Sequence, residues 1–136
     1  MNVLVWAEDK PLPEHADAYR RLYPGGIQKK LSEIVRACEN ADVRTATMQD
    51  AQQGLSDEAL SWADVLVYWS HKHWREVDEA RVDAMQRRVL EGMGLVVLHS
   101  AHASKIFARL MGTRTQMLRW RENDELQRYW IVNPPH

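Results

Sequence analysis

Polar side chains that can do chemistry follow directly after a continuous apolar run in the sequence. The run extends from Leu95 to Leu98, and His99, Ser100 and His102 come next. Such a run is typical of a strand buried on both faces of a parallel sheet. Because ligands of open α/β sheets bind beyond the carboxyl ends of the strands, these three side chains are the first candidates for a site.

Two further expected strands end in the same way. A strand over residues 2–6 precedes Glu8, and a strand over residues 64–69 precedes His71 and His73. The carboxyl ends of parallel strands meet at one edge of a sheet, so groups distant in sequence can converge there. The sequence therefore predicts one polar cleft, with His71, His99, His102 and Ser100 as its catalytic candidates.

A metal ion is one way to use these histidines. Imidazole nitrogens suit zinc and similar ions, so we expect a divalent, zinc-like metal at His99, His102 and His71. The spacing matches no closed zinc motif, however, and the chain has no second thiolate. The alternative, with no cofactor, is that the same histidines serve as acid–base groups or hydrogen-bond donors, since their free pKa lies near neutrality.

Ser100 is a candidate nucleophile with an unusual setting. The α/β-hydrolase elbow requires Gly-x-Ser-x-Gly because its turn is strained and crowded, but Leu98 and His102 occupy the glycine positions here. This argues against that elbow and favours a role for Ser100 as a hydrogen-bond donor to a ligand.

Tryptophans stand at several of the expected strand ends. The chain has six, and Trp6, Trp69 and Trp120 lie at or near such ends. Aromatic faces stack well on the apolar faces of sugar rings, although large side chains also pack at the edge of a sheet without any ligand. We expect a substrate-binding set of Trp6, Trp69 and Trp120, with Glu8.

The elements that must position these residues alternate along the chain. Strands over 2–6, 42–48, 64–69 and 95–98 are separated by expected helices over 26–38, 56–63 and 75–91, and a short helix follows, capped by Ser104 and stopped by Gly112. Residues 10–24 are expected to be a loop, and 115–120 with 128–132 a hairpin. The alternation predicts an α/β fold in three layers with a mostly parallel sheet in the order 2-1-3-4.

The length and composition of the chain indicate a single domain, and its charge gives no reason to expect a nucleic-acid or membrane partner. The 136 residues are 45% hydrophobic and carry a net charge of -1, so we expect one packed core over 1–136 and no nucleic-acid or membrane partner. Cys38 is the sole cysteine, which excludes an internal disulfide. No apolar run is long enough to span a bilayer. The expectation is a cytoplasmic protein.

Blocks of sequence throughout the chain carry a family resemblance. The strongest is Arg88-Val-Leu-Glu-Gly-Met-Gly-Leu-Val-Val-Leu-His-Ser-Ala-His102. The others are Trp6-Ala-Glu8, Tyr23-Pro-Gly-Gly-Ile27, Val43-Arg-Thr-Ala-Thr47, Asp64 to Trp69 with His71, Glu76-Val77, Ser104-Lys-Ile-Phe107, Leu110-Met-Gly-Thr113, Leu118-Arg-Trp-Arg-Glu122 and Val132-Asn-Pro134. Together they resemble the trehalose-utilisation family called ThuA, within the class I glutamine amidotransferase-like, flavodoxin-related superfamily.

The resemblance implies a fold and a substrate class but no settled reaction. It implies a flavodoxin-like three-layer sandwich and a role in the utilisation of trehalose and related disaccharides, on a sugar or an oxidised (keto) sugar. A non-catalytic sugar-binding or regulatory protein of carbohydrate metabolism is the alternative. Amidotransferase activity is not expected, because the turn after residues 95–98 carries His99 and Ser100 in place of a cysteine.

The chain departs from the family pattern in two ways. Gln28 stands where a histidine is expected, and Trp74 replaces a second histidine three places after His71. We also expect the chain to be the N-terminal part of a longer domain, with a sheet incomplete at its C-terminal end. An exposed edge would favour a homo-oligomer.

Overall fold

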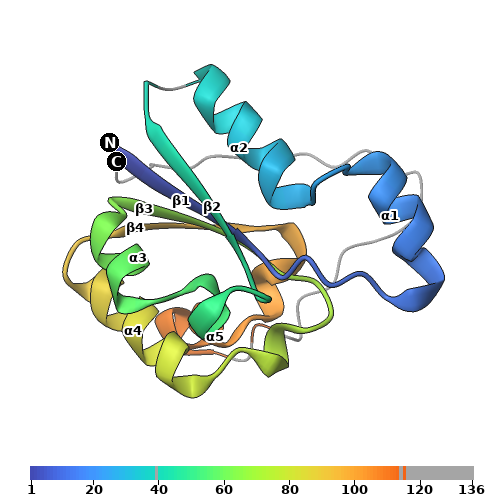
Figure 1. Ribbon diagram of the computed structural model, residues 1–136. Coiled ribbons are helices and arrows are strands. Elements are labelled where there is room, and N and C mark those ends of the chain that lie inside the picture. Colours follow the sequence, from blue (N-terminus) through green and yellow to red (C-terminus); the bar gives the residue numbers. More distant parts are fainter. Residues whose placement is uncertain (39, 114, 116–136) are drawn as a thin grey trace, which may run out of the picture.

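Four parallel strands form the sheet in the part of the chain that the structure describes. The structure is a computed structural model that describes residues 1–38, 40–113 and 115 (Figure 1). The strands are β1 (Asn2–Ala7), β2 (Asp42–Thr47), β3 (Val65–Trp69) and β4 (Gly94–Leu98). Their order is β2-β1-β3-β4 and every neighbouring pair is parallel, which confirms the predicted order 2-1-3-4.

Helices cover both faces of this sheet, so the predicted three layers are confirmed. Figure 1 shows α2 (Ile27–Cys38) on one face, and α3 (Asp57–Trp62), α4 (Glu79–Leu90) and α5 (Lys105–Met111) on the other. Successive strand residues point to opposite faces, which gives each helical layer its own apolar surface. Among the described residues, no helix has the length and apolar character needed to cross a membrane.

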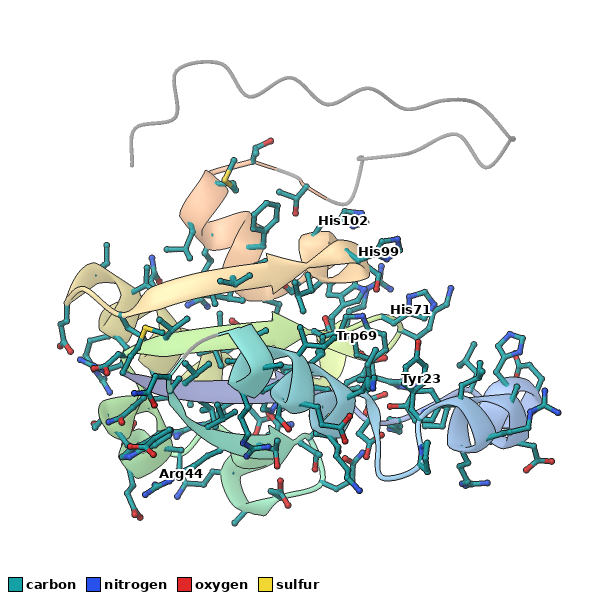
Figure 2. The ribbon with its side chains drawn as sticks, turned by 90° about the horizontal axis from the view of Figure 1, so that it is seen from above. Tyr23, Arg44, Trp69, His71, His99 and His102 are labelled. Atoms are coloured by element: carbon teal, nitrogen blue, oxygen red, sulfur yellow. The ribbon has the colours of Figure 1, made fainter. Side chains whose placement is uncertain are left out.

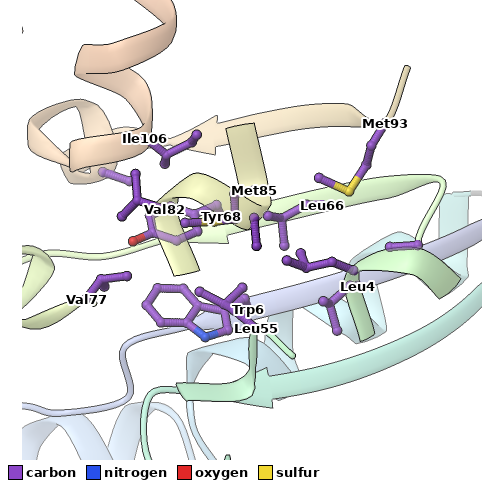
Figure 3. Close-up of a cluster of buried hydrophobic side chains, with 14 residues drawn as sticks. Leu4, Trp6, Leu55, Leu66, Tyr68, Val77, Val82, Met85, Met93 and Ile106 are labelled. Atoms are coloured by element: carbon purple, nitrogen blue, oxygen red, sulfur yellow. The ribbon is translucent and has the colours of Figure 1, made fainter. Parts of the chain in front are cut away.

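The larger core lies between the sheet and the α3–α5 layer. Its centre is the indole of Trp6, which is fully buried and stacks on Tyr68 with ring centroids 4.5 Å apart and planes 9° from parallel (Figure 3). The indole Nε1 donates a hydrogen bond of 2.7 Å to the carbonyl oxygen of Gln53. The sequence predicts that Trp6 binds substrate, and the structure corrects this: the residue has no exposed surface and its N–H group is already bonded in the core.

The opposite face of the sheet is covered less completely. Val3, Val5 and Val67 form the core there, and α2 packs over β1 and β2. β4 lies on the far side of β3 from these strands, and Val96 is 46% exposed. Among the described residues, the prediction that residues 95–98 are buried on both faces is therefore not met, because α2 packs over β1 and β2.

Several helices begin or end at capping residues that can be identified in the sequence. The Ser56 side chain accepts a hydrogen bond from the Ala59 amide at the start of α3, and Ser104 accepts one from Phe107 at the start of α5. Gly112 ends α5 in the left-handed conformation, at φ 65°. These are the N-cap and C-terminal glycine roles expected from the residue types.

Residues 10–24 are not a simple loop. They contain a 3-10 turn, Pro13–His15, and the helix α1 (Ala16–Leu22). Proline is well tolerated in the first turn of a helix, so the flanking prolines bound this helix instead of excluding it. The helix predicted over 75–91 is shorter than expected, because Trp74–Glu76 forms a separate 3-10 turn before α4. The predicted hairpin, apart from Thr115, lies outside the described residues.

The buried position of Trp6 is tested by substitution. We expect Trp6→Ala to lower the free energy of unfolding by about 3–5 kcal/mol, because it removes a large ring from a packed core. We expect Trp6→Phe to lower it by about 1–3 kcal/mol, since stacking on Tyr68 survives while the bond to Gln53 is lost. Urea unfolding measures both. A loss below about 1 kcal/mol for Trp6→Ala would mean that the ring lies at the surface.

Candidate functional site

The carboxyl ends of β3 and β4 bring the predicted polar residues to one edge of the sheet. Figure 2 shows Trp69, His71, His99 and His102 at the same end of the molecule. The positive charge of His99 is one of the influences that lower the pKa of His71. The convergence predicted from the strand order therefore holds for the histidines.

Glu8 fixes the loop that follows β3. Its side chain is 2% exposed, and its carboxylate oxygens accept hydrogen bonds from the backbone amides of Lys72 (2.9 Å) and His73 (3.1 Å). Its own amide donates to the Trp69 carbonyl oxygen at 3.1 Å. A carboxylate that accepts amide hydrogens makes strong, charge-assisted bonds. Glu8 therefore positions the loop, and the substrate contact expected of it stays a prediction.

A hollow of about 80 Å³ opens in front of this loop, and we call it the Trp69 hollow. It is lined by Glu8, Lys10, Pro11, Leu12, His15, Tyr19, Trp69, His71 and Lys72. The rings of Trp69 and His71 are nearly parallel, with planes 16° apart and centroids 6.2 Å apart. Of the predicted site residues, Trp69, His71 and Glu8 meet in this hollow.

The imidazole of His71 is held in its neutral form near pH 7. Partial burial lowers its pKa, and the positive charges of Lys72, His99 and His15 lower it further, against an opposing effect of Glu8. The ordinary pKa of histidine is about 6.5, so a lowered value leaves the ring uncharged at neutral pH. A neutral imidazole can accept a proton or a hydrogen bond.

His99 occupies a strained position at the end of β4. Its φ is 45°, in the left-handed region, and it opens the 3-10 turn His99–Ala103. His102 Nδ1 lies 3.2 Å from the His99 carbonyl oxygen. Nucleophile elbows also place their reactive residue on a strained turn directly after a strand. The strained residue here is His99, and strain of this kind gathers at functional sites.

Ser100 points away from the cleft. Its side chain is 6% exposed, and its hydroxyl donates a buried hydrogen bond of 2.9 Å to the Ser70 carbonyl oxygen. This bond joins the turn after β4 to the turn after β3. Ser100 thus holds these two turns together, and the catalytic role expected of it stays a prediction.

His73 is drawn into an ion-pair cluster beside the hollow. Its Nδ1 lies 2.6 Å from Glu76, whose other carboxylate oxygen lies 2.6 Å from the Lys10 ammonium. Lys10 and then His73 lower the pKa of Glu76 through these hydrogen bonds. The carboxylate therefore stays ionised and tethers Lys10 at the rim of the hollow.

A second hollow, of about 330 Å³, adjoins the first, and we call it the Tyr23 hollow. It is lined by Asp9, Pro11, Tyr19, Arg20, Tyr23, Gly25 and Gly26. The sequence does not indicate this hollow, because its prolines predict a loop over residues 10–24. The available signal was the i, i+4 spacing of Tyr19 and Tyr23, which places both rings on one side of a helix.

The described side chains do not form a metal centre as they stand. Among residues 1–38, 40–113 and 115, no three histidine, cysteine or carboxylate side chains come together in a way that could hold an ion. The carboxylate of Glu8, at the same edge of the sheet, already accepts hydrogen bonds from two backbone amides. A zinc-like ion at His71, His99 and His102 stays a prediction. Trp120 lies outside the described residues.

A comparison with known protein families shows to which family the chain belongs. A family model described as ThuA, trehalose utilisation, matches residues 2–136. The chain belongs to the ThuA family. A comparison with curated proteins gave no match. Membership confirms the resemblance found in the sequence, and it gives this ThuA protein a role in trehalose utilisation and an amidotransferase-like α/β fold.

The positioning role of Glu8 in this ThuA protein is tested with Glu8→Gln. The amide group of glutamine presents a donor where both oxygens now accept, so one backbone N–H loses its partner. We expect the free energy of unfolding to fall by about 1–3 kcal/mol, and the Lys72 and His73 amides to exchange faster with solvent. Urea unfolding and amide hydrogen exchange measure these effects.

Glu14→Gln is the matched control, because Glu14 is an exposed glutamate of the 3-10 turn before α1. We expect it to change stability by no more than about 0.5 kcal/mol. Equal effects of the two substitutions would contradict the role assigned to Glu8.

Proposed function

We propose that this ThuA protein acts on a sugar or an oxidised (keto) sugar derived from trehalose or a related disaccharide, bound at the Trp69 hollow. The observation that carries the proposal is the pairing of Trp69 with His71 in one wall of a hollow at the carboxyl ends of β1 and β3. The family role in trehalose utilisation supports the substrate class.

The hollow combines the two kinds of surface that a sugar needs. The indole of Trp69 offers an apolar face for the C–H groups of a sugar ring. Lys72 offers a polar group to its hydroxyls. A few polar groups in an otherwise apolar hollow fix the orientation of a ligand.

His71 is the residue we assign as the general base. Its lowered pKa leaves it neutral, so it can take a proton from a sugar hydroxyl or from the carbon beside the carbonyl of a keto sugar. His99 and His102, on the turn after β4, are the candidates for a second proton-transfer group. Glu8 and Ser100 act indirectly, through the loops that they hold.

A non-catalytic sugar-binding or regulatory protein is the second candidate. One observation favours it: the carboxylate of Glu8 and the hydroxyl of Ser100 are both engaged by backbone groups, so fewer reactive groups face the cleft than the sequence predicts. Binding of trehalose or keto-trehalose without turnover would select this candidate.

Turnover of keto-trehalose by the wild-type protein and its variants tests the enzymatic proposal. We expect His71→Gln, which keeps a hydrogen-bonding group but cannot act as a base, to lower kcat by at least ~100-fold with little change in binding. We expect Trp69→Ala to raise the dissociation constant by about tenfold, because it removes the stacking surface. Unchanged turnover in His71→Gln would contradict the role of His71.

The pH profile gives an independent reading of the same residue. Activity needs the unprotonated imidazole, so it should be present at neutral pH and fall as the pH drops below about 6.5. Lys72→Ala removes a positive charge that lowers the pKa of His71, so the fall should move to higher pH. A shift to lower pH would contradict this assignment.

A further inference from the structure

We propose that the Tyr23 hollow is a second subsite, which binds the second sugar ring of a disaccharide whose first ring enters the Trp69 hollow. This inference rests on the proposed function and extends it from a sugar to a two-ring substrate. It assigns a binding role to Asp9, Arg20 and Tyr23, none of which was a candidate from the sequence.

The two hollows adjoin. Pro11 and Tyr19 line both of them, so these two side chains form a shared wall. Figure 2 shows Tyr23 at the same end of the molecule as Trp69 and His71. A ligand that passes over Tyr19 would therefore reach both hollows without leaving the protein surface.

The Trp69 hollow is too small for a whole disaccharide, so a two-ring ligand needs a second subsite. The Trp69 hollow measures about 80 Å³, well below the ~300 Å³ at which small-molecule pockets usually begin. It can take one edge of a sugar ring. The Tyr23 hollow, at about 330 Å³, reaches that range by itself and has room for the other ring.

The walls of the Tyr23 hollow suit a neutral, hydroxyl-rich ligand. The ring centroids of Tyr19 and Tyr23 lie 5.4 Å apart, and the ring planes are tilted by 49°, so the two rings form an aromatic corner. The Asp9 carboxylate can accept hydrogen bonds from hydroxyls, and the Arg20 guanidinium can donate them. The N-terminus of α2 lies here, and helix N-termini can bind anions. An anion is nevertheless disfavoured, because Asp9 carries a negative charge. In addition, the Ile27 amide already donates to the Tyr19 hydroxyl at 3.0 Å.

The subsite is rigid before a ligand arrives. The Tyr19 hydroxyl donates to Asp9 at 2.7 Å while it accepts the bond from Ile27, so the shared wall is fixed at two points. Burial and the bond to Asp9 raise the pKa of Tyr19, which keeps its hydroxyl protonated. Fixed side chains reduce the entropy lost on binding.

A buried acceptor that lacks a donor in the described part of the chain lies behind the wall of the hollow. Gln28 is 7% exposed, and its Nε2 donates to the Gly25 carbonyl oxygen and to Asp9, both in the wall of the hollow. Its Oε1 has no hydrogen-bond partner among the described residues. A Cβ on Gly26 would lie 2.3–2.7 Å from this amide group, so the glycine lets Gln28 lie directly behind the wall.

Binding of trehalose and of glucose to the full chain, measured by isothermal titration calorimetry, tests the inference. Tyr23→Ala and Arg20→Ala both alter the Tyr23 hollow and leave the Trp69 hollow intact. We expect each to raise the dissociation constant for trehalose by about tenfold and to change that for glucose less than ~2-fold, because glucose needs only the first subsite. Arg20 is exposed, so Arg20→Ala tests the idea even if Tyr23→Ala fails to fold.

Arg21→Ala is the matched control, since Arg21 is the neighbouring exposed arginine of α1 and lines neither hollow. It should leave both dissociation constants unchanged. If folded variants at Arg20 and Tyr23 bind trehalose like the wild type, or lose glucose binding equally, the second subsite is overturned while the proposed function stands. If the wild type binds neither sugar, the proposed function fails and the subsite fails with it.

Discussion

The hydrogen bonds from the Lys72 and His73 amides to Glu8 are the constraint on which the candidate site depends. Glu8 directly follows β1, and its carboxylate is almost fully buried. The carboxylate holds in place the loop after β3, which carries His71. A buried carboxylate is costly unless its oxygens are satisfied, and here backbone donors satisfy them. The loop and the carboxylate therefore hold each other in place, and the Trp69 hollow forms in front of them.

Two further bonds extend this frame along the edge of the sheet. Ser100 connects the turn after β4 to the turn after β3, and Tyr19 connects Asp9 to the start of α2. Several polar side chains that the sequence suggests as reactive groups thus hold neighbouring loops and turns in position. The groups left to face a ligand are aromatic rings, an imidazole and a few charges, which is a surface suited to a sugar.

The sequence was sufficient for the sheet and for the edge at which the site lies. Apolar runs, helix caps and strand alternation depend on local physics, so the strands, their order and the caps at Ser56 and Ser104 were predictable. The direction of each side chain was not. Trp6 turns into the core because Tyr68 on β3 lies beside it, and Ser100 turns inward because the Ser70 carbonyl oxygen is within reach. These contacts join residues that are distant in sequence. The helix α1 was missed because its bounding prolines suggested a loop.

The central claim is that the edge held by Glu8 binds sugar, and a titration of the ¹⁵N-labelled protein with trehalose, followed by NMR, tests it most directly. The account predicts shifts of the Lys72 and His73 amide signals and of the Trp69 indole signal. The Trp6 indole should not move, because it is buried and donates to Gln53. Shifts confined to other regions, or no shifts at these three groups at saturating trehalose, would contradict the account.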